Sequence, residues 1–364
     1  MVWFLALPTR LAAQSPPIRQ DRAARLYAEG IAASRGGTPA GARDAIATWD
    51  RAARIARDAK DPTGESFLLR NIGDAYRQLG NSDSAIIYYQ GAAAAAQRGR
   101  DPRRAAMAFD RLGQAYRHSG RPGEAGMAFL LALRESRSAG DRAAEAGVLN
   151  NLGELYRGVG RFDSAAAYLG RAYRMMREVG DLQGEASTLA NLALVYQAVG
   201  VPDSALAILQ RTLQVFERTG NGAGVGITLN NIGEVQRGLG RPDAAMAYFT
   251  QALATVRATG DRQTEGTILN NIGLVLQRER KADTARALFA QALGLARRVG
   301  NRPGEGVAFN NLGSAYEDLS QPDSAFLYYN QALTIMREAG DGPGERIILD
   351  NIARVRRAGR SLQH

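Results

Sequence analysis

The sequence contains no cysteine, only two histidines (His118 and His364) and only two lysines (Lys60 and Lys281). The absence of cysteine excludes disulfides, thiolate nucleophiles, Cys-ligated zinc and iron–sulfur clusters. A single imidazole makes no convincing metal site, and neither a GxSxG motif nor a phosphate-binding loop motif occurs in the chain. We therefore expect no catalytic residue, no metal and no cofactor.

Aromatic residues and long apolar runs are also scarce. Only 7% of the chain is aromatic, whereas 45% is hydrophobic, a balance that suits closely packed helices rather than sheets. After the N-terminus no segment approaches the ~18 uninterrupted apolar residues that span a bilayer, so we expect no membrane span. The net charge of +10 is carried almost entirely by Arg, which fits carboxylate and phosphate geometry. Alternatively, this charge only reflects genome composition and keeps the chain soluble.

The first residues differ from the rest. Trp3 to Pro8 form a short apolar stretch, and the following Leu-Ala-Ala-Gln-Ser segment, which ends at Ser15, resembles a signal-peptidase site. No basic residue precedes the apolar stretch, and Arg10 is unusual in such a signal. We predict either a signal peptide over residues 1–14, with a periplasmic or secreted mature protein, or a disordered N-terminus on a cytoplasmic one. A linker follows over 15–20.

The remainder of the chain repeats itself every 40 residues. A small residue marks each repeat, at Gly73, Gly113, Gly153, Ala193, Gly233, Gly273, Gly313 and Ala353. Each of the first seven is followed twelve residues later by alanine, and four residues further on by a large apolar residue, at Tyr89, Phe129, Leu169, Leu209, Phe249, Phe289 and Tyr329. The apolar spacing within each repeat follows the helical period twice, which predicts two helices. Two helices approach closely only where small residues face the partner, and the large residue fills the space beside them.

The helix boundaries recur as regularly as the apolar residues. Gly closes the first helix of most repeats and Pro opens the second, for example at Gly120 and Pro122. The second helix ends at a Gly that is followed by Asp or Asn, as in Gly140 and Asp141, and this polar side chain can cap the next helix.

The pattern of Phe109, Leu112, Gly113, Tyr116, Gly120, Ala125, Phe129 and Ala132 resembles the tetratricopeptide repeat. The 40-residue period resembles the subclass found in kinesin light chain and in Leu-Gly-Asn-repeat adaptors. The resemblance implies an all-α, right-handed superhelical solenoid of antiparallel helix pairs. By offset, we predict a degenerate first repeat over 21–60, seven regular repeats over 61–340, a C-terminal capping helix over 341–358 and a disordered tail over 359–364. We expect the whole array to be one structural unit.

On the first helix of each repeat, the side chains that point away from the packed face share one stripe at i, i+3, i+4 and i+7 spacing. The family resemblance implies that this stripe lines a concave groove in which extended peptides of partner proteins bind. The predicted partner-binding residues are Asn150, Asn151, Arg157, Asn191, Asn230, Asn231, Arg237, Asn270, Asn271, Asn310 and Asn311. An asparagine amide both donates and accepts, so it can hold a peptide backbone. Alternatively, such a constant residue forms hydrogen bonds between repeats.

Arg157 and Arg237 suggest acidic groups on the partner, although pairing with Glu154 and Glu234 on the same helix is an equal alternative. The function that these features favour is a non-catalytic scaffold for protein interaction. A ligand-sensing module of a signalling system is the alternative. Nucleic-acid binding is less expected, because Glu154, Glu234 and Glu317 interrupt the basic residues of the stripe.

Overall fold

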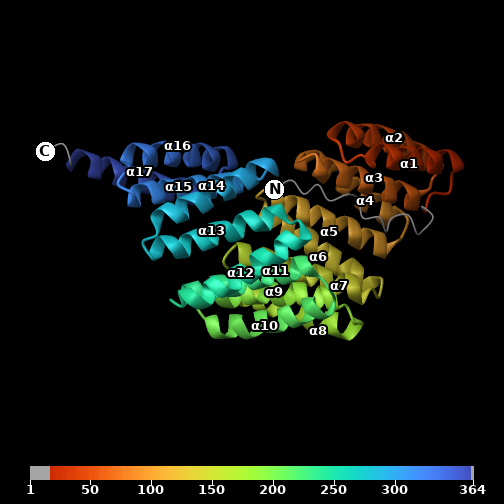
Figure 1. Cartoon of the computed structure of the whole chain (residues 1–364). Coiled ribbons are helices and arrows are strands. Elements are labelled where there is room, and N and C mark those ends of the chain that lie inside the picture. The colour runs from red at the N-terminus through yellow and green to blue at the C-terminus, as the bar shows by residue number, and fades with distance from the viewer. Residues whose placement is uncertain (1–16, 362–364) are drawn as a thin grey trace. The chain divides into compact units, whose positions relative to one another are not determined.

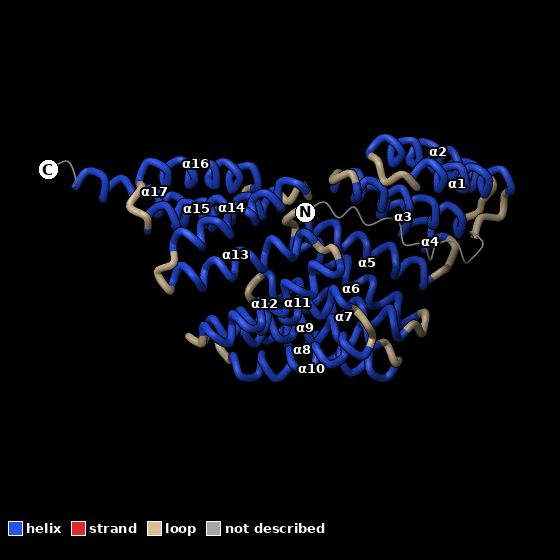
Figure 2. The backbone as a smooth tube through the Cα atoms, viewed as in Figure 1, coloured by secondary structure: helices blue, strands red, loops and turns tan. Residues whose placement is uncertain are grey.

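The computed structural model describes residues 17–361, and every regular element among them is an α-helix. Figures 1 and 2 show these helices joined by short loops. The predicted all-α solenoid is therefore confirmed. Residues 1–16, which include the predicted signal peptide, and residues 362–364 lie outside the described part. None of the described helices is both long and apolar enough to cross a membrane.

The chain divides into two compact units, which we call the N-terminal unit (Val2–Val199) and the C-terminal unit (Gly200–His364). The expectation of a single structural unit is wrong. The division falls between the two helices of one repeat, 181–220. In a solenoid each repeat contacts only its neighbours, so few contacts cross any junction and the array can divide at one of them.

The helices of the N-terminal unit pack in sequential order, each against the next. They are α1 (Asp21–Ser34), α2 (Pro39–Asp58), α3 (Pro62–Gln78), α4 (Ser82–Arg98), α5 (Pro102–His118), α6 (Pro122–Ser138), α7 (Arg142–Gly158), α8 (Phe162–Val179) and α9 (Leu182–Ala198). The pair α1 and α2 lies within the predicted first repeat, where Trp49 donates its indole N–H to the carbonyl of Tyr27 at 3.1 Å.

The C-terminal unit continues the alternation of first and second helices. Its helices are α10 (Pro202–Arg218), α11 (Gly222–Gly238), α12 (Pro242–Thr259), α13 (Arg262–Arg278), α14 (Ala282–Arg298), α15 (Arg302–Asp318), α16 (Pro322–Ala339) and α17 (Gly342–Ser361). The last helix, α17, has no second helix after it. Because α17 ends at Ser361, the prediction of a disordered tail is wrong for residues 359–361.

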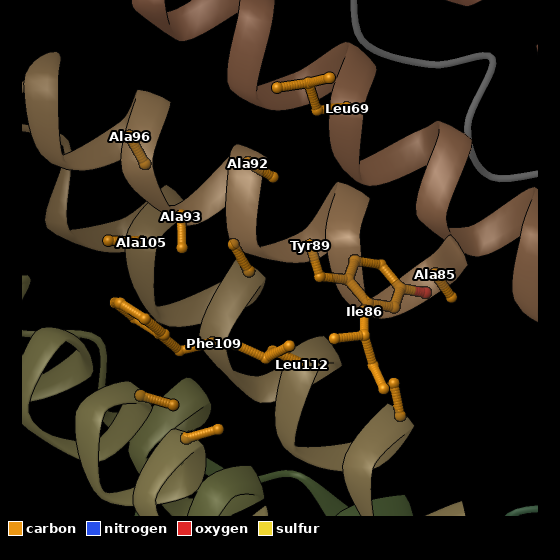
Figure 3. Close-up of a cluster of buried hydrophobic side chains, with 14 of the residues drawn as sticks. Leu69, Ala85, Ile86, Tyr89, Ala92, Ala93, Ala96, Ala105, Phe109 and Leu112 are labelled. Carbon is orange, nitrogen blue, oxygen red and sulfur yellow. The ribbon is translucent and has the colours of Figure 1, made fainter. Parts of the chain in front are cut away.

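Within each unit, the large apolar residue packs directly on the glycine of its repeat. A Cβ atom added at Gly113 would lie 2.6 Å from the ring of Phe129, and one at Gly233 would lie 2.6 Å from the ring of Phe249. A Cβ atom added at Gly73 would lie 2.6 Å from the ring of Tyr89, and Figure 3 shows Tyr89 on α4 with Ala85 and Ala92 of the same helix on either side of it. The glycine therefore allows the ring from the second helix to lie directly against the first helix.

The junctions carry the predicted stop and start residues. At the end of α3, Gly80 has a φ of 75°, and the amide of Asn81 donates to the carbonyl of Tyr76 at 2.9 Å. The Asn81 side chain then accepts from the amide of Ser84 at 3.0 Å and caps α4. Arg280 and Ser320, which replace glycine, adopt the same left-handed backbone with φ of 61° and 56°. The turn is thus kept where its usual residue is absent.

Candidate partner-binding site

The predicted stripe lies along the first helices of the repeats, which contact one another directly: α3, α5, α7 and α9 in the N-terminal unit, and α11, α13 and α15 in the C-terminal unit. These contacts place polar side chains of neighbouring repeats within hydrogen-bond distance. The stripe of each unit is described separately below.

In the N-terminal unit, asparagines link one repeat to the next. Asn191 on α9 donates to Oδ1 of Asn150 on α7 at 3.0 Å, and also to Oε1 of Glu154 at 2.8 Å. Asn151 on α7 donates to Oδ1 of Asp110 on α5 at 2.7 Å. The bonds to Asn150 and to Asp110 each join residues that are 41 positions apart. The contact therefore recurs with the 40-residue repeat.

The C-terminal unit repeats this arrangement. Asn271 on α13 donates to Asn230 and to Glu234 on α11, each at 2.9 Å. Asn311 donates to Asn270 at 3.2 Å, and Asn351 donates to Asn310 at 3.0 Å. These asparagine amides form hydrogen bonds between repeats, which was the alternative to direct contact with a partner. Their contact with a partner stays a prediction.

Asn231 is the exception among the predicted asparagines. In the part of the chain that the structure describes, its side chain only accepts from the neighbouring Asn230, at 3.5 Å, which is the limit of a hydrogen bond. The residue 41 positions earlier is Ala190, which has no side-chain acceptor. Asn231 is therefore only weakly held by side chains.

Asp110 occupies the acceptor position with a carboxylate instead of an amide. Burial raises the pKa of Asp110 above its ordinary value, while hydrogen bonds from Asn151 and Gln114 and the nearby Arg111 act in the opposite direction. The Gln114 bond is 2.7 Å long. The desolvation of the charge outweighs these favourable contacts.

A second set of contacts joins residues that are 37 positions apart. Arg117 donates to Glu154 of the next repeat, and Gln277 donates to Ser314 at 2.8 Å. In one pair the glutamate comes first in the sequence and the arginine 37 positions later. There Arg354 donates to Glu317 through two hydrogen bonds of 2.7 and 2.8 Å. The hydrogen bonds from Arg354 lower the pKa of Glu317, against the effect of burial.

Arg157 and Arg237 occupy the same position as Arg117, yet neither forms an ion pair or hydrogen bond with a side chain in the described part of the chain. The residues 37 positions later are Leu194 and Leu274, which have no acceptor. The Nε atom is buried without a hydrogen-bond partner in all three arginines, so it does not distinguish them. What distinguishes Arg117 is the acceptor that Glu154 offers to its Nη1 atom. Arg157 and Arg237 are both partly buried.

The alternative of pairs within one helix is not observed for these arginines. Glu154 accepts from Arg117 and Asn191, and Glu234 accepts from Asn271. These carboxylates are thus used between repeats. The sequence signal for these pairs is the 37-residue spacing of opposite charges, as between Arg117 and Glu154.

Across residues 17–361, no group of three or more His, Asp and Glu side chains is placed to hold a metal ion. The arrangement instead offers two partly buried guanidinium groups, each beside a row of bonded amides. Such groups recognise planar anions such as carboxylates.

Antiparallel helix pairs at a constant spacing define a helical-repeat solenoid. The family model described as tetratricopeptide repeat matches residues 104–178, 184–258 and 264–338, and a second model of that description matches 68–103. The chain belongs to the tetratricopeptide repeat family, as its sequence pattern predicted. It is accordingly a protein-interaction scaffold.

Three solved structures illustrate the proteins that share this fold. Aspartyl phosphate phosphatase F from Bacillus subtilis matches with a TM-score of 0.64 and 14% identity, covering 87% of this chain and 84% of its own. The apo form of the quorum sensor NprR from B. thuringiensis matches with a TM-score of 0.62 and 15% identity, covering 86% and 87%. The Rap conjugation gene regulator of plasmid pLS20, in complex with the Phr* peptide, matches with a TM-score of 0.55 and 16% identity, covering 77% and 78%. A comparison with curated protein sequences finds no match.

Proposed function

We propose that the stripe of each unit binds extended, acidic segments of partner proteins, with Arg157 and Arg237 binding the partner's carboxylates. The observation that carries this proposal is the lack of an acceptor for these two arginines, at a position where Arg117 has Glu154. A carboxylate of the partner would supply to Arg157 and Arg237 the charge-assisted hydrogen bond that Glu154 supplies to Arg117.

The bonded asparagines support the arginines in this proposal. Asn191 and Asn271 are fixed by two bonds each, so the helices that carry the stripe are held in register. A preorganised surface loses little side-chain entropy when a partner binds. One of the proteins with this fold was solved in complex with a peptide, which is consistent with a peptide ligand.

Two other functions are less well supported. A sensing role in signalling would use the same stripe, and a regulator with this fold is described as a quorum sensor. Nucleic acid is disfavoured as a ligand because Glu154, Glu234 and Glu317 stay within the stripe and neutralise the cations around them. We further propose that the chain has no catalytic role.

The double variant Arg157→Ala with Arg237→Ala tests the proposal. We expect each arginine to contribute about 1.5–3 kcal/mol to binding of a partner captured from the native organism, measured by calorimetry. The melting temperature should hardly change, because neither side chain pairs with another side chain within residues 17–361. Arg174→Ala, an exposed arginine on α8, is the control. Unchanged affinity in the double variant would show that the stripe assignment is wrong.

We also propose that the chain is exported, on the basis of the apolar N-terminus and the Ala-Ala-Gln-Ser segment. Expression from the full upstream sequence should yield a mature chain that begins near Gln14 or Ser15. Mass spectrometry of the N-terminus measures this directly. An intact Met1 on cytoplasmic protein would contradict export.

A further inference from the structure

A cleft of about 560 Å³ lies in the N-terminal unit, away from the stripe. One wall is a face of α3 that includes Glu65 and Leu69, and the other is a face of α4 that includes Gly91 and Ala94. On each helix the lining residues follow the i, i+3, i+7 spacing of a single face. On α3 this face is roughly opposite the one that carries the stripe. The volume is in the range of small-molecule sites, about 300–1,000 Å³.

The cleft is open because Gly91 has no side chain. The corresponding residues of the other repeats are all large, namely Leu131, Arg171, Arg211, Gln251, Gln291 and Gln331. A Cβ atom at Gly91 would lie 3.3 Å from Leu69, so a longer side chain would enter the space beside that residue. The first regular repeat thus differs from the others at the position that opens the cleft.

Three of the residues that line this space are cations and one is a carboxylate. Asp50 and Asp58, which do not line it, also act on Arg57. Glu65, whose side chain is 5% exposed, accepts from Nε of Arg57 at 2.7 Å and from Nη2 of Arg98 at 2.6 Å. Lys60 adds a third positive charge to the lining, which leaves a formal charge of +2. Each guanidinium keeps further N–H donors for a ligand, and both arginine side chains are more than half exposed.

Lys60 is placed in a backbone conformation that favours glycine. Its φ is 56°, and the corresponding turns contain Gly140, Gly180, Gly220, Gly260, Gly300 and Gly340, with Arg100 as the other exception. A left-handed conformation is unfavourable for a residue that carries a Cβ atom. Lys60 lines the cationic cleft in this strained conformation, and backbone strain that is kept at a ligand site is one sign of a role in binding.

We propose that this cleft binds a small organic anion with two negative charges beside an apolar group, of which a phosphate monoester is the simplest case. Arg57, Lys60 and Arg98 hold the phosphate, because guanidinium forks match its oxygens and the ammonium adds a point charge. The apolar group lies against Leu69 and Ala94. This site is separate from the stripe and does not depend on its function.

Phenyl phosphate is a suitable probe, with inorganic phosphate and phenol as comparisons, and calorimetry on the full chain gives the affinities. We expect saturable binding of one phenyl phosphate, and at least about tenfold weaker binding of each comparison compound, since each carries half of the recognised chemistry. No binding of phenyl phosphate would overturn the proposal. Equal binding of inorganic phosphate would overturn the organic part of it.

Two variants test whether the ligand binds in the cleft. Gly91→Leu fills the space and should abolish binding while the helix stays folded. Lys60→Gly should weaken binding by at least about tenfold, as expected for the loss of one charge-assisted contact, and should raise the melting temperature because it relieves the strained turn.

Arg280→Gly is the matched control for Lys60→Gly. It also relieves a left-handed arginine, with φ of 61°, but lies in the C-terminal unit. We expect it to raise the melting temperature without changing the affinity for phenyl phosphate. Gly294→Leu is the control for Gly91→Leu, because a Cβ atom there meets open space. Binding that survives in both Gly91→Leu and Lys60→Gly would place the ligand elsewhere and overturn the proposal.

Discussion

At the scale of single residues, one side chain in the neighbouring repeat decides whether a polar group supports the fold or stays free for a ligand. Arg117 is bound by Glu154, whereas Arg157 is followed at the same distance by Leu194. The two arginines have the same place on their helices. Their chemical difference arises entirely from the next repeat, and it is the basis of the proposed peptide site.

Gly233→Ala should destabilise the protein by about 1–3 kcal/mol, the usual cost of overpacking a core. The added methyl group would lie 2.6 Å from the ring of Phe249, which is fully buried. Gly238→Ala on the same helix meets no atom within 4 Å and should instead stabilise by about 0.5–1 kcal/mol. Denaturant unfolding measures both. Equal effects of the two substitutions would show that the close packing of Gly233 is not what fixes this residue.

Asp110→Asn should stabilise the protein at neutral pH. Because burial raises the pKa of Asp110 in the folded state, the native chain loses stability as the pH rises from the unfolded value towards the folded one. An amide has no such loss, and Asn150 already serves as an acceptor in the next repeat. Unfolding curves from acid to neutral pH should therefore diverge, with the variant more stable at the upper end. The converse change, Asn150→Asp, should lose stability over the same range.

At the scale of the helices, the asparagine bonds fix each first helix against the next one. Asn271 donates two hydrogen bonds to α11, and the acceptors Asn230 and Glu234 lie one turn apart on that helix. Contact at two points one turn apart restrains sliding as well as separation of the two helices. The bonds therefore set the register between repeats, which apolar packing alone specifies less sharply.

Asn271→Ala should destabilise the chain by about 1–3 kcal/mol, because it leaves the buried Asn230 and one oxygen of Glu234 without their donor. Asn231→Ala, at the same position of the preceding repeat, is the control. It should cost less than about 0.5 kcal/mol because Asn231 has only a 3.5 Å contact. Thermal and denaturant unfolding of both variants decide the point. Similar losses would mean that the bonds between repeats contribute little.

At the scale of the whole molecule, the two compact units meet in sequence inside one repeat. The residues that differ from the pattern there are Ala190, in place of an acceptor, and Leu194, in place of a carboxylate. Stability of such an array is approximately a sum of repeat and neighbour terms, so the missing carboxylate at Leu194 removes one such term between α7 and α9 of the N-terminal unit.

Removal of residues 181–220 should leave a folded, shorter helical array. In the shortened chain Asn231 follows Asn150 by 41 positions and Glu234 follows Arg157 by 37, the spacings of the observed bonds. We therefore expect a cooperative melting transition by circular dichroism and a new ion pair between Arg157 and Glu234. Because that pair occupies Arg157, partner binding should weaken. Loss of cooperative unfolding would show that the chain is not a stack of exchangeable repeats.

The sequence by itself determined the repeat, the helix boundaries and the small residues, because these depend on contacts within about forty residues that recur at every repeat. Glycine at a left-handed turn and asparagine at a helix start act locally, so their roles can be read without neighbours. Only the tertiary structure decided which asparagines are bonded, that Arg157 and Arg237 lack an acceptor, and where the array divides. These outcomes depend on the angle and distance at which one repeat packs on the next. The packing of all the side chains of both helices sets that geometry, and no local sequence pattern does.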